Sequence, residues 1–412
     1  MSGLVVLGAS YAGIQTALTA RDAGYAEPIT VVADEDWLPY QRPPLSKAFL
    51  LDLAREESLV LRDRGFFATR QIDLLLGERA TKIDPHAREV LLHSGARLAF
   101  DKLMIGTGSH ARRLDIAGAE LDGVCYLRAM NDAVDLRSRL RHAESVVVIG
   151  GGFIGLEVAA SAIKLGKQVT LLEAAPRLLE RAVSDVVSAF LLDMHRRHGV
   201  DVRLGAGVAS IEGRGGKVAS VTCADGRTLP ADLVVVGIGG VANDQLAGDA
   251  GLACANGIMV DDHGGTTHPD IFAAGDCANH HNVFAGGRVR LESVQNAQDQ
   301  AKAAGFAIAG RTAPYTSVPR FWSDQYDVKL QTVGLSKGFD ALAIRGAIDD
   351  GKFSVFYYRG PRLIAVDSIN RPGDQMAARR LIAEGLSPSR AAATDLGFDF
   401  KSLVAPANGA DA

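Results

Sequence analysis

Two copies of one strand–turn–helix–strand pattern constrain this chain more than any other feature. The first is LVVLGASYAGIQTALTARDAGYAEPITVVAD, from residue 4, and the second is VVVIGGGFIGLEVAASAIKLGKQVTLLE, from residue 146. Each runs from an apolar strand through a glycine turn and a helix to a second apolar strand that ends near an acid. This is the βαβ pattern that binds dinucleotides, with the pyrophosphate resting on the helix N-terminus. The sequence therefore predicts two Rossmann-like units.

The second copy is complete. Gly150, Gly152 and Gly155 form the glycine fingerprint, and Glu173 ends the second strand. An acid at this place accepts hydrogen bonds from a ribose diol and repels a 2′-phosphate, which favours NADH over NADPH. Arg177 follows closely enough to weaken that preference.

The first copy departs from the pattern. Gly8 and Gly13 are present, but Ser10 replaces the middle glycine. Serine is small enough to leave room for a pyrophosphate. The acid comes late, at Asp34 or Glu35, and we favour Asp34 for the ribose contact.

Composition excludes several other functions. The chain has 412 residues, 47% hydrophobic and 22% charged, and a formal net charge of -4, which argues for neither a nucleic-acid nor a membrane-surface binder. Its four cysteines have no CxxC, CxxxxC or zinc-like spacing. His280 and His281 are adjacent, a poor chelating geometry, so no metal site is expected. The apolar stretches fit strand–turn–helix units better than membrane segments, and we expect a cytoplasmic protein.

Three further segments bring a known superfamily into view. DKLMIGTGSHARR (residues 101–113) and ADLVVVGIGGVAND (231–244) are similar strand-then-glycine segments, and TTHPDIFAAGDCA (266–278) ends a short apolar strand in an acid. With two fingerprints in this order, the chain resembles the FAD- and NAD(P)-dependent pyridine nucleotide oxidoreductases. The resemblance implies FAD at the first site and NAD at the second.

A proline-rich segment narrows the resemblance. WLPYQRPPLSK (residues 37–47), together with RGFFATRQIDLLLG, RLESVQNAQDQA and FWSDQYDVKLQTVGLS, resembles the ferredoxin reductases that serve bacterial cytochrome P450s and ring-hydroxylating dioxygenases. Relatives that reduce disulfides carry redox cysteines beside the flavin, and this chain carries none there. Electrons must therefore leave the flavin directly for an external acceptor, or for oxygen.

The fold class that follows is α/β. We expect two Rossmann-like dinucleotide-binding domains, with the FAD domain discontinuous and the NAD domain inserted, plus a C-terminal α+β domain. The expected ranges are 1–112 and 241–311 for the FAD domain, 113–240 for the NAD domain and 312–412 for the C-terminal domain.

The resemblance also implies site residues. The expected FAD contacts are Gly8, Ser10, Ala12, Gly13, Asp34, Arg42, Pro44, Lys47, Ala80, Thr107, Gly108, Arg128, Gly275, Asp276 and Val294. The expected NAD contacts are Gly150, Gly152, Ile154, Gly155, Glu157, Glu173 and Gly239.

Three residues are the candidates for a role at the hydride path. Lys47 is expected near the flavin N5 edge, where a cation favours the reduced anion, and it can pair with Glu157. Trp322 is expected beside the flavin near the nicotinamide. The alternatives are a solvated loop lysine, a helix first-turn acid stabilised by the helix dipole, and a core tryptophan.

The implied partner is an acidic [2Fe-2S] ferredoxin that feeds a P450 or a similar oxygenase, and the implied assembly is a monomer or a weak homodimer. Charge complementarity calls for a local basic patch, and its candidates are Arg62, Arg64, Arg288, Arg290 and Lys302. An NADH oxidase or a rubredoxin or quinone reductase is the alternative enzyme. A flavoprotein whose redox state governs an interaction is the non-catalytic alternative.

Overall fold

The structure is a computed structural model, and it describes residues 2–403. The chain divides into two compact units. Unit 1 comprises residues 1–112, 127–137 and 239–317, and unit 2 comprises residues 113–126, 138–238 and 318–412. The division groups the C-terminal segment with the second dinucleotide fold. One of its boundaries, between residues 137 and 138, falls within helix α4 (Met130–His142).

Unit 1 is built on a seven-stranded sheet in the order β3-β2-β1-β6-β5-β4, with β18 paired to β6. The pairings among β3, β2, β1, β6 and β18 are parallel, whereas β4, β5 and β6 pair antiparallel. The strands are β1 (Gly3–Leu7), β2 (Ile29–Ala33), β3 (Ile72–Leu76), β4 (Ala80–Asp84), β5 (Glu89–Leu92), β6 (Arg97–Ile105) and β18 (Ile271–Ala273). This arrangement confirms the first βαβ prediction.

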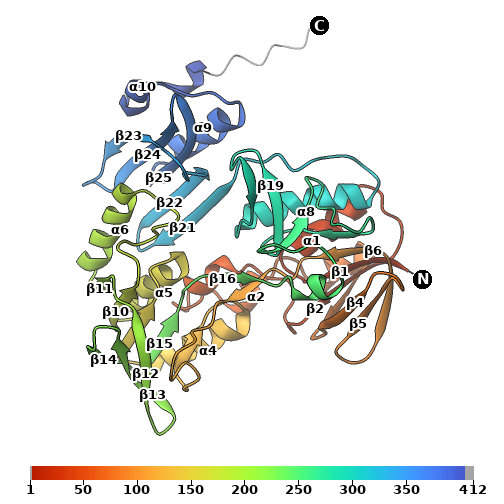
Figure 1. Ribbon diagram of the computed structural model, residues 1–412, viewed down its shortest axis with the longest axis horizontal. Helices are drawn as coiled ribbons and strands as arrows, with labels where there is room; N and C mark the ends of the chain where they lie inside the picture. The colour runs from red at the N-terminus through yellow and green to blue at the C-terminus, as the bar shows by residue number, and fades with distance from the viewer. Residues whose placement is uncertain (1, 404–412) are drawn as a thin grey trace. The chain divides into compact units, whose positions relative to one another are not determined.

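Helices and smaller sheets complete unit 1. Helix α1 (Tyr11–Asp22) packs closely on α8 (Val294–Ile308), because Gly305 has no side chain to strike Thr19 (Figure 1). The short helices are η1 (Pro43–Ser46), α2 (Glu56–Leu59), α3 (Arg64–Thr69) and α7 (Gln245–Asp249). The remaining strands are β7 (Ser109–Ala111), paired with β16 (Gly240–Ala242), and the sheet of β17 (Ile258–Val260), β19 (Ala278–Asn282) and β20 (Gly287–Val289).

Unit 2 contains a second parallel sheet, in the order β11-β10-β9-β15-β8. Its strands are β8 (Val124–Tyr126), β9 (Ser145–Ile149), β10 (Gln168–Glu173), β11 (Asp201–Leu204) and β15 (Leu233–Val236), and its helices are α5 (Phe153–Lys164) and α6 (Asp185–Arg197). An antiparallel sheet of β12 (Val208–Arg214), β13 (Lys217–Cys223) and β14 (Thr228–Pro230) extends from it. The strand β9, helix α5 and strand β10 reproduce the second predicted fingerprint.

A five-stranded antiparallel sheet ends the described chain, in the order β21-β22-β25-β24-β23. Its strands are β21 (Arg320–Gln325), β22 (Val328–Gly334), β23 (Ala341–Ala347), β24 (Lys352–Arg359) and β25 (Arg362–Ile369), followed by α9 (Pro372–Ala383), α10 (Arg390–Thr394) and η2 (Phe400–Leu403). Successive side chains of a strand point to opposite faces. One face meets α5 and α6, and the other meets α9, α10 and η2 (Figure 1).

A polar cluster lies in the contact between this sheet and α6. Asp367 is 0% exposed and accepts hydrogen bonds from the hydroxyls of Tyr357 (2.5 Å) and Thr332 (2.7 Å). The Tyr357 hydroxyl also meets Ser184, the N-cap residue of α6, at 3.0 Å. Burial raises the pKa of Asp367 to about 6, although both hydroxyl donors favour the ionised form. The sheet is therefore joined to the coenzyme domain through a carboxylate that ionises reluctantly.

Within residues 2–403, no helix is long and apolar enough to cross a membrane.

The raised pKa of Asp367 predicts a specific pH dependence of stability. The Asp367 carboxyl group holds its proton more tightly in the folded state than in the unfolded state. Its contribution to the stability of the fold is therefore present below about pH 4 and is lost as pH rises to about 6. The side chain of Asp367→Asn stays neutral. The free energy of unfolding of this variant, relative to that of the wild type, should therefore rise by up to about 3 kcal/mol over that interval. Urea unfolding of both proteins from pH 4 to pH 7.5 measures the difference.

Asp73→Asn, an exposed change on β3, is the matched control and should alter stability by less than about 0.5 kcal/mol at every pH. A difference between Asp367→Asn and the wild type that does not vary with pH would contradict the assignment.

Candidate active site

The two glycine turns have nearly the same geometry. Gly8 follows β1 with a φ of +104°, and Gly150 follows β9 with a φ of +107°. A Cβ at Gly8 would lie 2.3 Å from the carbonyl oxygen of Gly106, and one at Gly150 would lie 2.4 Å from that of Gly237. Gly106 follows β6 and Gly237 follows β15, so the paired glycine segments of the sequence are the walls against which the two turns pack.

The second turn separates a glycine that the fold requires from one that it does not. A Cβ at Gly155 would lie 2.1 Å from the carbonyl oxygen of Gly150, because helix α5 packs directly on the turn. At Gly152 the φ is −81°, and the nearest atom to a Cβ would be the carbonyl oxygen of Gly237, at 3.7 Å. Neither strain nor packing explains Gly152, whereas close approach of a pyrophosphate does.

Neither helix begins with a side-chain cap at these turns. The side chain of the N-cap residue Ser10 makes no cap hydrogen bond, the N-cap residue Gly152 has no side chain, and neither first turn contains an acid. The first-turn N–H groups of a helix need acceptors, and the helix dipole favours an anion there. The residues of both turns therefore fit dinucleotide pyrophosphates.

Glu173 lies where the second fingerprint requires an acid. Its carboxylate accepts from the amides of Gly151 (2.6 Å) and Ala175 (2.7 Å), which fixes it at the edge of the turn. The nearby guanidinium of Arg177 donates to the carbonyl oxygens of Val183 and Glu180. Arg177 is thus engaged with the backbone and is poorly placed to receive a 2′-phosphate.

At the first site, side chains of the proline segment bind one of the two candidate acids, Glu35, and leave Asp34 exposed. Glu35 accepts from the Arg42 guanidinium and from the Tyr40 hydroxyl, each at 2.6 Å. Asp34, one residue earlier, is exposed at the end of β2. Because Glu35 is occupied in this internal network, Asp34 is the acid better placed for the ribose.

Burial controls the ionisation of this network. It raises the pKa of Tyr40, which therefore stays a neutral donor. For Arg42, burial opposes the charge, but Tyr40 and Glu35 outweigh it and the pKa is raised. Arg42 also meets the Ser10 hydroxyl at 3.4 Å, so a permanent cation lies beside the glycine turn.

Arg128 and Asp276 form a second charged pair in unit 1. The Arg128 guanidinium donates to Asp276 at 2.6 Å and to the carbonyl oxygen of Ser109 at 2.8 Å. The Arg128 carbonyl in turn accepts from Arg42 at 2.8 Å. A Cβ at Gly108 would lie 3.5 Å from the same guanidinium. Four separate segments therefore converge here.

The AAGD turn lies beside the first helix. A Cβ at Gly275 would be 3.0 Å from Cβ of Ala12 and 3.4 Å from Cβ of Ala297 on α8. Val294 is the first residue of α8, one turn before Ala297. Thr107 donates to the carbonyl oxygen of Asn243 at 2.8 Å. The structure thus brings most of the expected FAD residues together.

Ala80, Pro44 and Lys47 are placed less directly. Ala80 starts β4 after a turn whose Glu78 amide donates to the carbonyl oxygen of Ala33, which places it near the end of β2. Pro44 lies in the short helix η1 and Lys47 directly follows it, and both are half-buried. A proline-rich segment is expected to form neither a long helix nor a central strand. Their contacts with a flavin stay a prediction.

On the nicotinamide side, Ile154 is 41% exposed although it is apolar, and it lies in the first turn of α5. Glu157, one turn later, is 6% exposed and accepts from the Ser323 hydroxyl at 2.6 Å. Trp322 is adjacent to Ser323 on β21, so its side chain points to the opposite sheet face. Its place beside a flavin stays a prediction, as does the Lys47–Glu157 pair. Gly239 has a φ of +105°.

Sequence reasoning missed several partners of these residues. Tyr40 and Ser323 stand inside the quoted segments LPYQRPPLSK and FWSDQY, which was the available signal. Ser109, Asn243 and Gln325 also stand inside quoted segments, namely DKLMIGTGSHARR, ADLVVVGIGGVAND and FWSDQY. His195 lies outside every quoted segment and carried no signal, because a single polar residue in a helix is ordinary.

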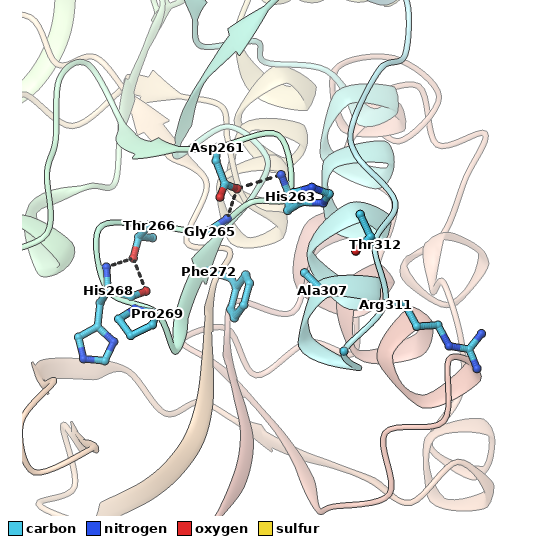
Figure 2. Close-up of a pocket in the computed structure, with 11 residues that line it drawn as sticks. Asp261, His263, Gly265, Thr266, His268, Pro269, Phe272, Ala307, Arg311 and Thr312 are labelled. Carbon is cyan, nitrogen blue, oxygen red and sulfur yellow. Dashed lines mark hydrogen bonds between the residues drawn. The ribbon is translucent and has the colours of Figure 1, made fainter.

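A pocket lies elsewhere in unit 1, between the turn from Asp261 to Phe272 and the end of α8 (Figure 2). The Asp261 carboxylate accepts from the amides of His263 and Gly265 and so closes its own turn. Arg311 points away from the other lining side chains in Figure 2. No residue expected at either dinucleotide site lines this pocket, so it is separate from the candidate active site.

Comparison with protein families decides the family. Residues 2–301 match the pyridine nucleotide-disulphide oxidoreductase model, and residues 320–404 match the reductase C-terminal model. The chain belongs to the pyridine nucleotide-disulphide oxidoreductase family. The predicted family and fold class are confirmed, and so are FAD and NAD as the cofactors that this family uses.

Similar proteins span nearly the whole chain. Rhodocoxin reductase from Rhodococcus erythropolis is 45% identical over 404 residues, covering 98% of this chain and 94% of that protein. A crystal structure of a ferredoxin reductase from Rhodopseudomonas palustris matches with a TM-score of 0.95 and 42% identity, covering 98% and 99%. The reductase in a covalent putidaredoxin reductase–putidaredoxin complex matches with a TM-score of 0.95 and 40% identity, covering 99% of each chain.

The contrast between Gly152 and Gly155 predicts opposite mutant behaviour. Gly152→Ala has room for its methyl group, so the melting temperature should stay within about 2 °C, while the Kd for NADH should rise at least about tenfold because the pyrophosphate loses its approach. Gly155→Ala should instead lower the melting temperature by several degrees, since its methyl group strikes a carbonyl oxygen. Calorimetry measures the melting temperatures and NADH titration measures the Kd values. Equal effects of the two substitutions on stability would contradict the inference that the fold requires Gly155 but not Gly152.

The fixed Glu173 carboxylate predicts the coenzyme preference. Glu173→Gln keeps an acceptor at the turn but removes the charge that repels a 2′-phosphate, so the NADH/NADPH ratio of kcat/KM should fall about tenfold. Steady-state kinetics with both coenzymes give the ratio. The exposed Glu180→Gln is the control and should leave it unchanged. An unaltered ratio in Glu173→Gln would place the ribose elsewhere.

Proposed function

We propose that this protein is an NADH-dependent ferredoxin reductase that supplies electrons to a cytochrome P450 or a similar oxygenase. One NADH and two oxidised [2Fe-2S] ferredoxins yield NAD⁺, one proton and two reduced ferredoxins. The observation that carries the proposal is the pairing of two dinucleotide sites with a proline segment that contains no redox cysteine. Relatives of matching length that are named ferredoxin or rhodocoxin reductases support it.

FAD, when bound, supplies the central chemistry, because a flavin accepts a hydride and releases single electrons. The chain supplies binding and orientation. The N-terminus of α5, with room at Gly152, would hold the NADH pyrophosphate, and Glu173 would hold its ribose. The N-terminus of α1, with Arg42 and Arg128, would hold the FAD pyrophosphate. Lys47 would add positive charge near the ring.

We infer an acidic electron-transfer protein as the partner. The covalent complex of a relative, putidaredoxin reductase, with putidaredoxin supports a ferredoxin in this role. The structure narrows the candidate basic patch. Arg62 and Arg64 are exposed at helix α3. Arg288 donates to the carbonyl oxygens of Asn279 and Val260, Arg290 pairs with Glu292, and Lys302 pairs with Asp299. We therefore favour Arg62 and Arg64 as docking residues.

We also infer that the protein works in the cytoplasm, where its NADH substrate is replenished.

A coupled assay tests the function. The purified protein should be yellow with about one FAD per chain, and NADH should bleach it within seconds under anaerobic conditions. Cytochrome c reduction by NADH should depend on an added [2Fe-2S] ferredoxin and increase at least tenfold over the rate without it. A fully folded colourless protein, or a rate that is equal without a carrier or higher with rubredoxin, would overturn the assignment.

A further inference from the structure

A chain of buried hydrogen bonds leads from the C-terminal sheet to Glu157 on the coenzyme helix. The Ser323 hydroxyl donates to Glu157 at 2.6 Å, and the Gln325 amide donates to the Ser323 hydroxyl at 3.1 Å. The oxygen of the Gln325 side chain meets His195 Nε2 at 2.8 Å, and His195 Nδ1 meets the Tyr326 hydroxyl at 3.4 Å. Every link lies inside unit 2.

The bond between Ser323 and Glu157 sets the direction in which hydrogen bonds are donated along this chain. The Ser323 hydroxyl has one proton, which it donates to the Glu157 carboxyl group, so it can only accept from Gln325. The Gln325 amide group then faces Ser323, which turns its oxygen toward His195. His195 must therefore carry its proton on Nε2 and accept at Nδ1.

Four members of the chain are buried, and Tyr326, at its end, is half-buried. Glu157 is 6% exposed, Ser323 is 1%, Gln325 is 2% and His195 is 0%. Burial lowers the pKa of His195 to about 4, so it stays neutral near pH 7, as its role between a donor and an acceptor requires. A fully satisfied buried polar network of this kind fixes the orientation of its members.

We propose that Ser323, Gln325 and His195 are positioning residues that orient the Glu157 carboxylate for the nicotinamide of bound NADH. This inference rests on the proposed function, because it assigns Glu157 to the nicotinamide side of the second site. Through this hydrogen-bond chain the C-terminal sheet contributes to hydride transfer, although none of the three positioning residues belongs to the dinucleotide fingerprint. Glu157 lies one turn beyond the amides that would hold the pyrophosphate.

The test compares two buried serines of the same sheet. Ser323→Ala removes the donor to Glu157. Ser354→Ala, the matched control, removes a donor to the Asp374 carboxylate (2.8 Å) on the other sheet face. We expect Ser323→Ala to slow anaerobic flavin bleaching by saturating NADH about tenfold, because the lost bond is to a charged group. The Kd for NAD⁺, held mainly by the adenosine side, should change less than threefold.

Ser354→Ala should keep the wild-type bleaching rate and the wild-type Kd for NAD⁺. Ser323→Thr retains the hydroxyl and should restore the bleaching rate to within threefold of the wild type. Gln325→Glu, which can still accept from His195 but cannot donate to Ser323, is a second variant should Ser323→Ala fold poorly, and it should slow bleaching in the same direction. A Ser323→Ala rate equal to that of Ser354→Ala would overturn the proposal, as would a loss that Ser323→Thr does not recover.

An independent readout needs no turnover. In protein carrying ¹⁵N-labelled histidine, the resonance missing from His195→Asn identifies His195 and its protonated nitrogen. The proposal requires a proton on Nε2; a proton on Nδ1 overturns it. The failure of the proposed function is distinct, because a wild-type flavin that NADH bleaches without passing electrons to ferredoxin would refute the partner and leave Glu157 positioning intact.

Discussion

The rest of the structure depends on how closely each coenzyme helix approaches the turn that precedes it. A Cβ at Gly13 would lie 1.9 Å from the carbonyl oxygen of Gly8, and one at Gly155 would lie 2.1 Å from that of Gly150. Only glycine permits this contact, and the contact aims the first-turn amides of the helix at the turn. Since an anion is the natural acceptor for these amides, each unit is built around a turn whose geometry fits a phosphate.

The two sites differ in what surrounds that shared centre. At the first, four segments supply Ser10, Arg42, Arg128 and Asp276, linked by ion pairs and backbone bonds. At the second, most of the expected contacts come from one βαβ unit that ends at Glu173, and Gly239 adds a second segment. A cofactor that remains bound through many turnovers suits an enclosing set of segments, whereas a coenzyme that must leave after each hydride suits a simpler site.

Sequence pattern predicted the parts of the molecule that depend on spacing. The two fingerprints and their flanking glycine segments lie at fixed intervals, and the structure confirms their strands and helices. The sequence favoured Asp34 over Glu35 without a physical reason, because the bonds from Arg42 and Tyr40 to Glu35 exist only in the folded chain. Gln325 and His195 are 130 residues apart in sequence, and His195 belongs to no recognised motif, so their bond could be seen only in three dimensions.

The strand β21 shows how one short segment can serve two environments. Alternation places Ser323 and Gln325 on the face that meets α5 and α6, and it places Trp322 on the other face. The segment FWSDQY therefore encodes two interleaved sets of contacts. One set ties the C-terminal sheet to the coenzyme helix through Glu157, while the other, which includes Trp322, lies on the opposite face of the sheet. A domain that lacks the dinucleotide fingerprint can thereby act on the coenzyme site through alternate residues of a single strand.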